Sequence, residues 1–248
     1  MQDDPEAAAT LDALEIKGGL PVIAKGDEYV NGLELARIDR LFGLTDDESS
    51  ALLPVDDIVR RARRLLGLVS RYARQLPVDR YDDPIPGMEN VRAPVTMPDG
   101  TVLVRRDGRH YVPHSTNITL VHHIVGHGYK LQQIAADVDF DVTDVSVYGS
   151  LGEPEEDASL DEVCAALESI SAGIGEWFAR SRVGDSECVV PTFYGDQSVH
   201  QLLHSNAYSL TQHTRQLMTV LIQLGIEPAE RLTDPDFTGL LLPEGVWA

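Results

Sequence analysis

The fold of this chain depends on one stretch, TFYGDQSVHQLLHSNAYSLTQHTRQLMTVLIQLG at residues 192–225, which predicts a single long amphipathic helix. Leu202, Leu217 and Val220 fall on one stripe of that helix, at about 100° of rotation per residue. The same stripe carries three polar side chains, those of Asn206, Ser209 and His213. Burial of a polar group without a partner costs about 1–3 kcal/mol. These groups therefore either form a hydrogen-bonded core network or line a binding site.

A second stretch, HSTNITLVHHIVGHGYKLQQIAA at residues 114–136, predicts another helix with an apolar stripe. His123 and His127 fall on or beside that stripe, four residues apart. Two histidines at this spacing lie on one helix face and can hold one metal ion. A third ligand from a facing helix would complete an open site of the catalytic type, and His213 lies on the facing polar stripe.

Composition limits the function classes. The chain has 248 residues, of which 43% are hydrophobic, so it can form one large or two small globular domains. It carries 40 acidic and 20 basic residues, for a net charge of −20. Nucleic acids and anionic membranes both need a cationic surface, so we expect neither as a partner.

Cysteine usage and hydropathy indicate a cytoplasmic protein. The two cysteines, Cys164 and Cys188, form no CxxC pair and no zinc-ligand spacing, which favours a reducing compartment. The sequence shows no secretory signal and no run of about 18 apolar residues.

The remaining pattern predicts a mainly α fold. Amphipathic helices are expected at residues 55–76 and 159–180, the second beginning with a capping box from Ser159 to Glu162. A β-hairpin is expected as an insertion at residues 101–112, turning at an Asp-Gly pair. Four long helices, with a long crossover between the second and third, predict a four-helix bundle.

The N-terminal residues 1–44 predict an α-β-β-α order, and an acidic linker at residues 45–53 separates them from a domain at residues 54–248. Within the first segment, Leu20-Pro21-Val22 and Val30-Asn31-Gly32 resemble the C-terminal half of a glutaredoxin or thioredoxin fold. This resemblance implies that Pro21 corresponds to the proline of the loop that binds a thiol ligand. The half of that fold that carries the CxxC motif has no counterpart here, so thiol-disulfide chemistry is not implied.

The larger domain resembles the DinB-like four-helix bundle family. The match rests on TFYGDQSVHQLLHSNAYSLTQHTRQLMTVLIQLGIEP and on the tail LTDPDFTGLLLPEGVW, which is similar to the subgroup with a glutaredoxin-like N-terminal domain. The resemblance implies a divalent metal, zinc or nickel, bound by three histidines. One comes from the second helix and two come from an HxxxH pair in the fourth. It also implies a homodimer and a transferase or isomerase that uses a low-molecular-weight thiol.

Matched residue by residue, the family's ligands fall on His123 and His213, while the first histidine of the HxxxH pair is replaced by Ser209. Serine is a poor ligand for zinc or nickel. His127 could supply the missing ligand, and Asn206 with Ser209 would then orient substrate or water. Alternatively, the metal site is lost and the polar patch is a hydrogen-bonded core.

Four other histidines are not expected to be ligands. His200 and His204 lie roughly 140–220° around an ideal helix from His213, which argues against them as ligands. His110 and His114 are expected as exposed loop histidines.

Two functions follow as hypotheses. The first is a metal- and thiol-dependent transferase. The alternative is a non-catalytic bundle that serves as a dimerisation module or binds a small molecule or protein. A thiol-disulfide oxidoreductase is less consistent with the placement of the cysteines.

Overall fold

The computed structural model describes residues 22–26, 28–31, 52–86, 114–136, 143, 151–155, 157–182, 185–192, 195–240 and 242–247. Most of these lie in the four long helices α3 (Val55–Gln75), α4 (Asn117–Ala136), α6 (Leu160–Arg180) and α7 (Val199–Gln223). The mainly α prediction is therefore confirmed for the part of the chain that the structure describes.

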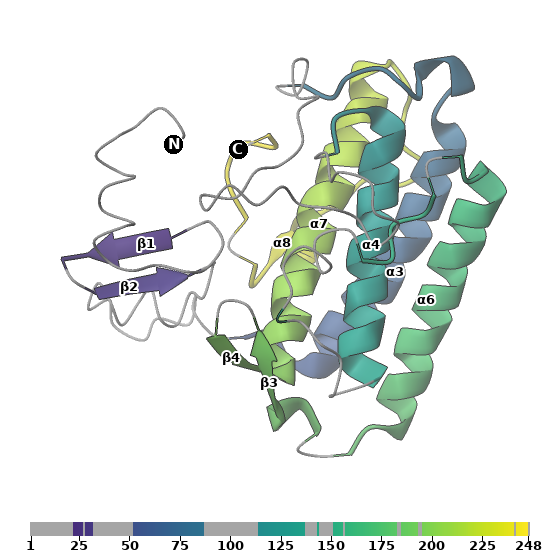
Figure 1. Ribbon diagram of the computed structural model, residues 1–248. Coiled ribbons are helices and arrows are strands. Elements are labelled where there is room, and N and C mark those ends of the chain that lie inside the picture. The colour runs from purple at the N-terminus through teal and green to yellow at the C-terminus, as the bar shows by residue number, and fades with distance from the viewer. Residues whose placement is uncertain are drawn as a thin grey trace.

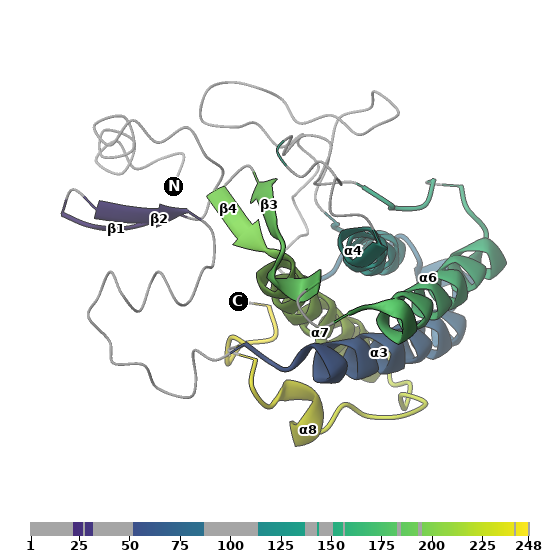
Figure 2. The same ribbon diagram turned by 90° about the horizontal axis from the view of Figure 1, so that it is seen from below.

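The four long helices, which we call the helical core, pack side by side. The chain rises through α3, descends through α4 and α6, and rises again through α7 (Figure 1). Viewed along the helices, α7 lies between α4 and α3, and α6 lies between α3 and α4 on the other side (Figure 2). The four packed edges are thus α3–α6, α6–α4, α4–α7 and α7–α3.

The interior between the helices is apolar. Leu66 and Leu68 of α3, Leu120 of α4, Ile174 of α6 and Leu202 of α7 are all fully buried. Full burial of one such side chain contributes about 1.5–3 kcal/mol relative to leaving it in water. The predicted stripes of the four helices are the faces that meet here.

The start of the last long helix differs from the prediction. Residues 192–225 were expected as one helix, but α7 begins at Val199, where Ser198 and Gln201 form a capping box. The preceding residues instead form a two-stranded antiparallel sheet of β3 (Val189–Thr192) and β4 (Gly195–Ser198). The capping box sets the N-terminal end of α7. The Ser198 side chain accepts a hydrogen bond from the Gln201 amide, which would otherwise need a carbonyl from a preceding helical turn.

The capping box predicted for α6 is confirmed. The Ser159 side chain accepts from the Glu162 amide, and the Glu162 carboxylate accepts from the Ser159 amide at 2.8 Å. The second helix begins at Asn117 rather than at residue 114, because Ser115 and Thr116 are engaged in bonds to other segments. Two short turns, η2 (Val78–Arg80) and η3 (Asp185–Glu187), complete the connections that the structure describes.

The predicted strand–turn–strand near the N-terminus is confirmed. β1 (Val22–Lys25) pairs with antiparallel β2 (Glu28–Asn31), and Gly26 takes a φ of 63° at the turn. The expected helices at residues 4–16 and 33–44, the hairpin at 101–112 and the proline at position 21 lie outside the described residues.

The described residues of the C-terminal segment, 226–240 and 242–247, pack back against the helical core. Arg64 of α3 forms ion pairs with Glu230 and with Asp236, which belongs to the short helix α8 (Asp234–Phe237). Leu240 is buried in the core. Arg60, Arg61 and Arg71 of α3 form ion pairs with acidic residues as well.

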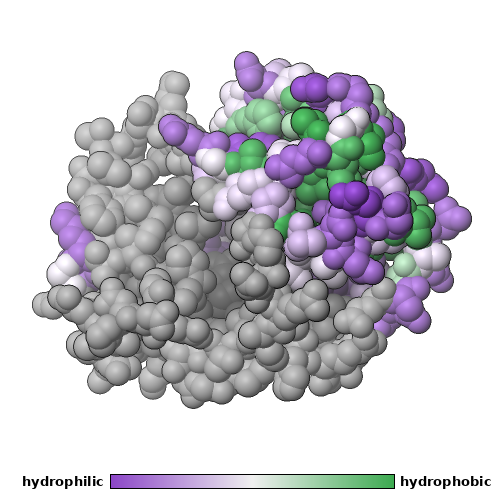
Figure 3. Space-filling view, turned by 90° about the horizontal axis from the view of Figure 1, so that it is seen from above, coloured by the Kyte–Doolittle hydropathy of each residue, from purple (hydrophilic) through white to green (hydrophobic). Residues whose placement is uncertain are grey.

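Neither cysteine forms a disulfide: Cys164 is buried and Cys188 is exposed. Among the described helices, none has the length and the apolar character that crossing a membrane requires. From above, hydrophobic residues of the described surface lie among hydrophilic ones that surround them (Figure 3).

We expect Leu66→Ala to lower the free energy of unfolding by about 2–5 kcal/mol, because truncation leaves a cavity where Leu66 is fully buried. Val78 is 75% exposed, so Val78→Ala is a matched control that should change stability by no more than about 0.5 kcal/mol. Urea unfolding of both variants checks this, and equal losses would contradict the packing described.

Candidate metal centre

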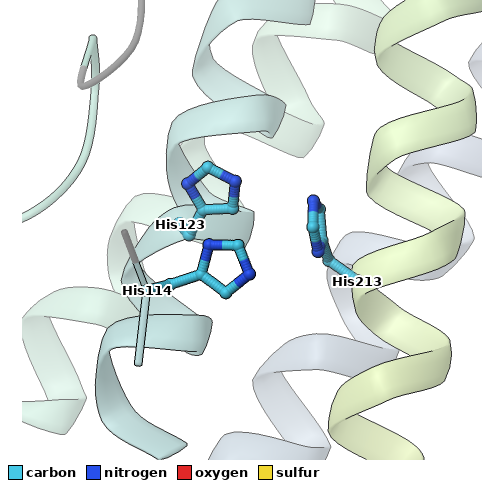
Figure 4. A group of neighbouring side chains, drawn as sticks. All are labelled: His114, His123 and His213. Atoms are coloured by element: carbon cyan, nitrogen blue, oxygen red, sulfur yellow. The ribbon is translucent and has the colours of Figure 1, made fainter. Parts of the chain in front are cut away.

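Four histidines meet where α4 packs against α7. His123 and His127 come from α4, His213 comes from α7, and His114 comes from the segment just before α4. Figure 4 shows His114 and His123 facing His213 across the space between the two helices. His114, His123 and His213 each offer one ligand atom, and these atoms lie within 4.8 Å of one another.

The fourth ring, that of His127, closes the group. Its centroid lies 4.6 Å from that of His123 and 5.2 Å from that of His213, against which it stacks. His114 stacks on His123 at 4.2 Å and lies edge-on to His213 at 4.9 Å. We call these four residues the histidine cluster.

Three of the four rings lie on the facing sides of α4 and α7 and meet where these helices pack, whereas His114 is placed by hydrogen bonds. The Ile85 amide donates to the Ser115 carbonyl at 3.0 Å, and the Asn117 side chain donates to the Arg80 carbonyl at 2.9 Å. Pro84 and Thr116 form an isolated β-bridge. These bonds tie the start of α4 to residues 80–85 and hold His114 against the cluster.

His123 is oriented by a carboxylate. Its Nδ1 lies 2.9 Å from Oε1 of Glu153, which belongs to the crossover between α4 and α6. A carboxylate accepts hydrogen bonds, so Nδ1 carries the proton and Nε2 keeps its lone pair. Ligating histidines in metalloproteins are commonly held by such a carboxylate.

Gly126 makes room for that carboxylate. A Cβ at this position would lie 2.9 Å from Cγ of Glu153 and 3.2 Å from the Leu151 carbonyl oxygen. The crossover can therefore approach α4 closely only because residue 126 has no side chain. Gly152, next to Glu153, takes a φ of +74°, a conformation that glycine adopts without strain.

His213 is oriented by an amide. Its Nδ1 lies 2.7 Å from Oε1 of Gln216, one turn further along α7. The amide oxygen is an acceptor, so His213 also carries its proton on Nδ1 and keeps a lone pair on Nε2.

The His127 ring contacts its neighbour directly. Its Nε2 lies 3.1 Å from Nε2 of His123. Because Nε2 of His123 has the lone pair, His127 donates in this contact.

Burial keeps the cluster uncharged. Desolvation lowers the pKa of His114 to about 2 and that of His213 to about 4. Desolvation also lowers the pKa of His123 and His127 well below the usual 6.5, and the nearby charge of Lys130 adds to the effect. Neutral imidazole is the form that binds a metal ion.

Lys130 lies one turn beyond His127 on α4 and is only 2% exposed. Burial lowers its pKa to about 8, and the charge of Glu153 acts in the opposite direction. The cluster is therefore bordered by one ammonium and one carboxylate inside the protein.

The residues present fit a divalent transition metal. Imidazole nitrogen suits zinc, nickel, copper and iron. Nδ1 of His114 is buried and has no hydrogen-bond partner among the described residues. Zinc–nitrogen bonds of about 2.0–2.1 Å put tetrahedral ligand atoms about 3.3 Å apart. The three rings, whose ligand atoms lie within 4.8 Å, would close on an ion by small side-chain rotations.

The structure brings together all three histidines that the sequence singles out, His123, His127 and His213. The expectation that His114 is an exposed loop residue is wrong, because the bonds at the start of α4 turn it inward. A histidine immediately before a helix with two inward histidines was the only sequence signal for it.

Of the two polar residues expected to line the site, Asn206 interacts with the histidine cluster, whereas Ser209 bonds to its own helix. Asn206 is buried and donates to the Leu202 carbonyl at 2.9 Å. Burial lowers the pKa of His127, and a smaller effect of the Asn206 side chain raises it. Ser209 is half-buried, and its hydroxyl donates to the Ser205 carbonyl of its own helix at 3.3 Å.

His200 and His204 point elsewhere, as the helical angles predict. Nε2 of His200 lies 2.7 Å from the Leu53 carbonyl oxygen, and His204 bonds to the backbone of Gly239. His110 and Pro21 lie outside the described residues.

Comparisons with protein-family models, with curated proteins and with solved structures found no match to this chain.

We expect the metal-free protein to lose stability as the pH falls from about 6.5 to about 4, because the pKa of His213 drops to about 4 on folding. In this window the unfolded chain binds the proton and the folded chain does not. Above the window the contribution is fully present. His213→Gln should reduce the slope of unfolding free energy against pH by up to about 1.4 kcal/mol per pH unit.

The measurement is urea unfolding at a series of pH values. His200→Gln is the control, since it removes a histidine of the same helix outside the cluster. Identical slopes for wild type and His213→Gln would show that His213 does not titrate as described.

We expect Gly126→Ala and Gly67→Ala to differ in their effect on stability, although both place alanine inside a helix. At Gly67 nothing lies within 4 Å of an added Cβ, so alanine should raise the unfolding free energy by about 0.5–1 kcal/mol. At Gly126 the added Cβ meets Glu153 and the Leu151 carbonyl. That variant should lose this gain and shift the NMR signal of the His123 Nδ1 proton, whereas an unchanged signal would argue against the close approach.

Proposed function

We propose that this chain is a DinB-like four-helix bundle protein that binds one divalent metal ion, zinc or nickel, in its histidine cluster. One observation supports this most. Glu153 and Gln216 hold the protons of His123 and His213 on Nδ1, which leaves a lone pair on Nε2 of each ring. Two oriented imidazoles with a third beside them form the kind of donor set that transition metals prefer.

In this proposal His114, His123 and His213 are the ligands. His114 takes the place that the family's HxxxH pattern gives to residue 209, where this chain has a serine. Nε2 of His127 lies 3.1 Å from Nε2 of His123 in the metal-free protein, and an ion bound to that His123 nitrogen would displace this hydrogen bond. His127, once released, would be available either as a fourth ligand or as a base beside the ion. Asn206 acts on His127 from α7 and would keep its ring in place.

We propose further that the site serves a transferase that uses a low-molecular-weight thiol. When bound, a divalent metal ion lowers the pKa of a coordinated thiol or water and so produces a nucleophile near neutral pH. The chain itself supplies the neutral imidazoles, holds them between α4 and α7, and offers His127 as a proton acceptor.

A non-catalytic binding or dimerisation module is the second candidate. It is favoured by the direct contact between His123 and His127, since two imidazoles that hydrogen-bond to each other satisfy themselves without an ion. Thiol-disulfide exchange has less support, because Cys164 is buried beside the Ser70 carbonyl and belongs to a different helix from the cluster.

Elemental mass spectrometry of the purified protein tests the metal site. We expect about one zinc or nickel ion per chain in the wild type, and a loss of the ion in His114→Ala and in His213→Ala, since each removes a ligand. His200→Ala is the matched control, because His200 bonds to Leu53 and lies outside the cluster.

If His114→Ala retains the metal and His127→Ala loses it, the third ligand is His127 and not His114. Absence of metal from the wild type, even after reconstitution with zinc and nickel salts, would overturn the metal-binding proposal and favour the non-catalytic module. Circular dichroism on each variant shows whether it is folded.

A further inference from the structure

Side chains of α7 hold the C-terminal tail by its carbonyl groups. One guanidinium nitrogen of Arg215 donates to the carbonyls of Pro243 and Gly245, each at 2.8 Å. The side-chain amides of Gln212 and Gln216 both donate to the Val246 carbonyl, at 2.8 Å and 3.1 Å. We call residues 243–246 and these three side chains the tail clamp.

The helix spacing explains the tail clamp. Residues 212, 215 and 216 fall on one face of α7, because positions three and four apart are neighbours on a helix. Leu240 before the clamped carbonyls is buried, and Leu242 and Trp247 pack against the core on either side of them. The tail is therefore fixed both by apolar contacts and by hydrogen bonds.

Gln216 joins the tail to the histidine cluster. A backbone carbonyl can only accept, so the NH₂ group of Gln216 must face Val246. The amide oxygen of Gln216 must then face His213, and an oxygen acceptor requires a proton on Nδ1 of His213. The Val246 carbonyl thus fixes the orientation of the Gln216 amide, and this amide fixes the proton of His213 on Nδ1. The lone pair of His213 is therefore on Nε2.

We propose that the tail clamp is a positioning device for the histidine cluster: the Val246 carbonyl sets the tautomer of His213 through Gln216. Gln216 is the positioning residue, and the tail controls which way its amide points. The part that concerns metal affinity rests on the proposed function, but the part that concerns the tautomer does not.

Release of the tail has a defined consequence. Without the Val246 carbonyl, the Gln216 amide is free to turn its NH₂ group toward His213. Nδ1 must then accept, so the proton moves to Nε2 and that nitrogen ceases to be a metal ligand. A segment that contacts no ion would in this way govern whether His213 can bind one.

NMR of the metal-free full chain with isotope-labelled histidine tests the proposal, because imidazole nitrogen shifts distinguish the two tautomers. His213 is assigned by comparison with His213→Gln. Gln216→Leu breaks the connection itself. The double variant Gln212→Leu/Arg215→Met loosens the tail and leaves Gln216 intact, and hydrogen exchange of the amides at 244–247 reports whether the tail has been released. Gln223→Leu is the control for the same substitution at an exposed site of α7.

We expect wild type and Gln223→Leu to show His213 with its proton on Nδ1. Gln216→Leu and the double variant should show the Nε2–H tautomer, wholly or as a mixture. Affinity for zinc, measured by competition with a chelator, should fall about 10–100-fold in Gln216→Leu.

A His213 that stays Nδ1-protonated in Gln216→Leu would overturn the proposal. If His213 changes tautomer in Gln216→Leu but stays Nδ1-protonated in the double variant, although the tail amides of that variant exchange freely, then Gln216 acts without the tail. This result would refute the role of Val246. If the wild type binds no zinc, the proposed function fails, while the tautomer measurement still decides the present inference.

Discussion

The contact between α4 and α7 is the interaction on which the centre of the molecule depends. The two helices pack against each other and contribute buried apolar side chains such as Leu120 and Leu202 to the core. At one level imidazole rings replace them, and desolvation makes it costly for those rings to carry charge. The surrounding structure must therefore satisfy neutral rings, each with one donor and one acceptor nitrogen.

Two irregular segments meet that requirement from opposite sides. The crossover before α6 supplies Glu153 to His123, and the C-terminal tail fixes Gln216, which bonds to His213. Both segments lie outside the long helices, and both act on Nδ1 of a ring. The helices thus bring the rings together, while the connections decide which nitrogen of each ring is protonated.

Periodicity predicted the long helices and placed His123 and His213 toward each other, because apolar spacing reports which helix face is buried. It could not predict His114, whose position depends on bonds between residues 80–85 and the start of α4. Glu153 was equally inaccessible, since the crossover has no repeating pattern. The true start of α7 did have a signal, the Ser198-x-x-Gln201 capping box, which a reading guided by periodicity alone passed over.

Lys130 and Glu153 give the interior beside the cluster a formal sum of zero, with the ammonium at +1, the carboxylate at −1 and the imidazoles neutral. A divalent cation would raise that sum to +2 in a region with little water to screen it, where charge interactions are several times stronger than in solution. Electroneutrality would then favour a companion of negative charge, such as a thiolate or hydroxide, over a neutral molecule. The buried lysine would in this way select the ionic form of whatever shares the ion.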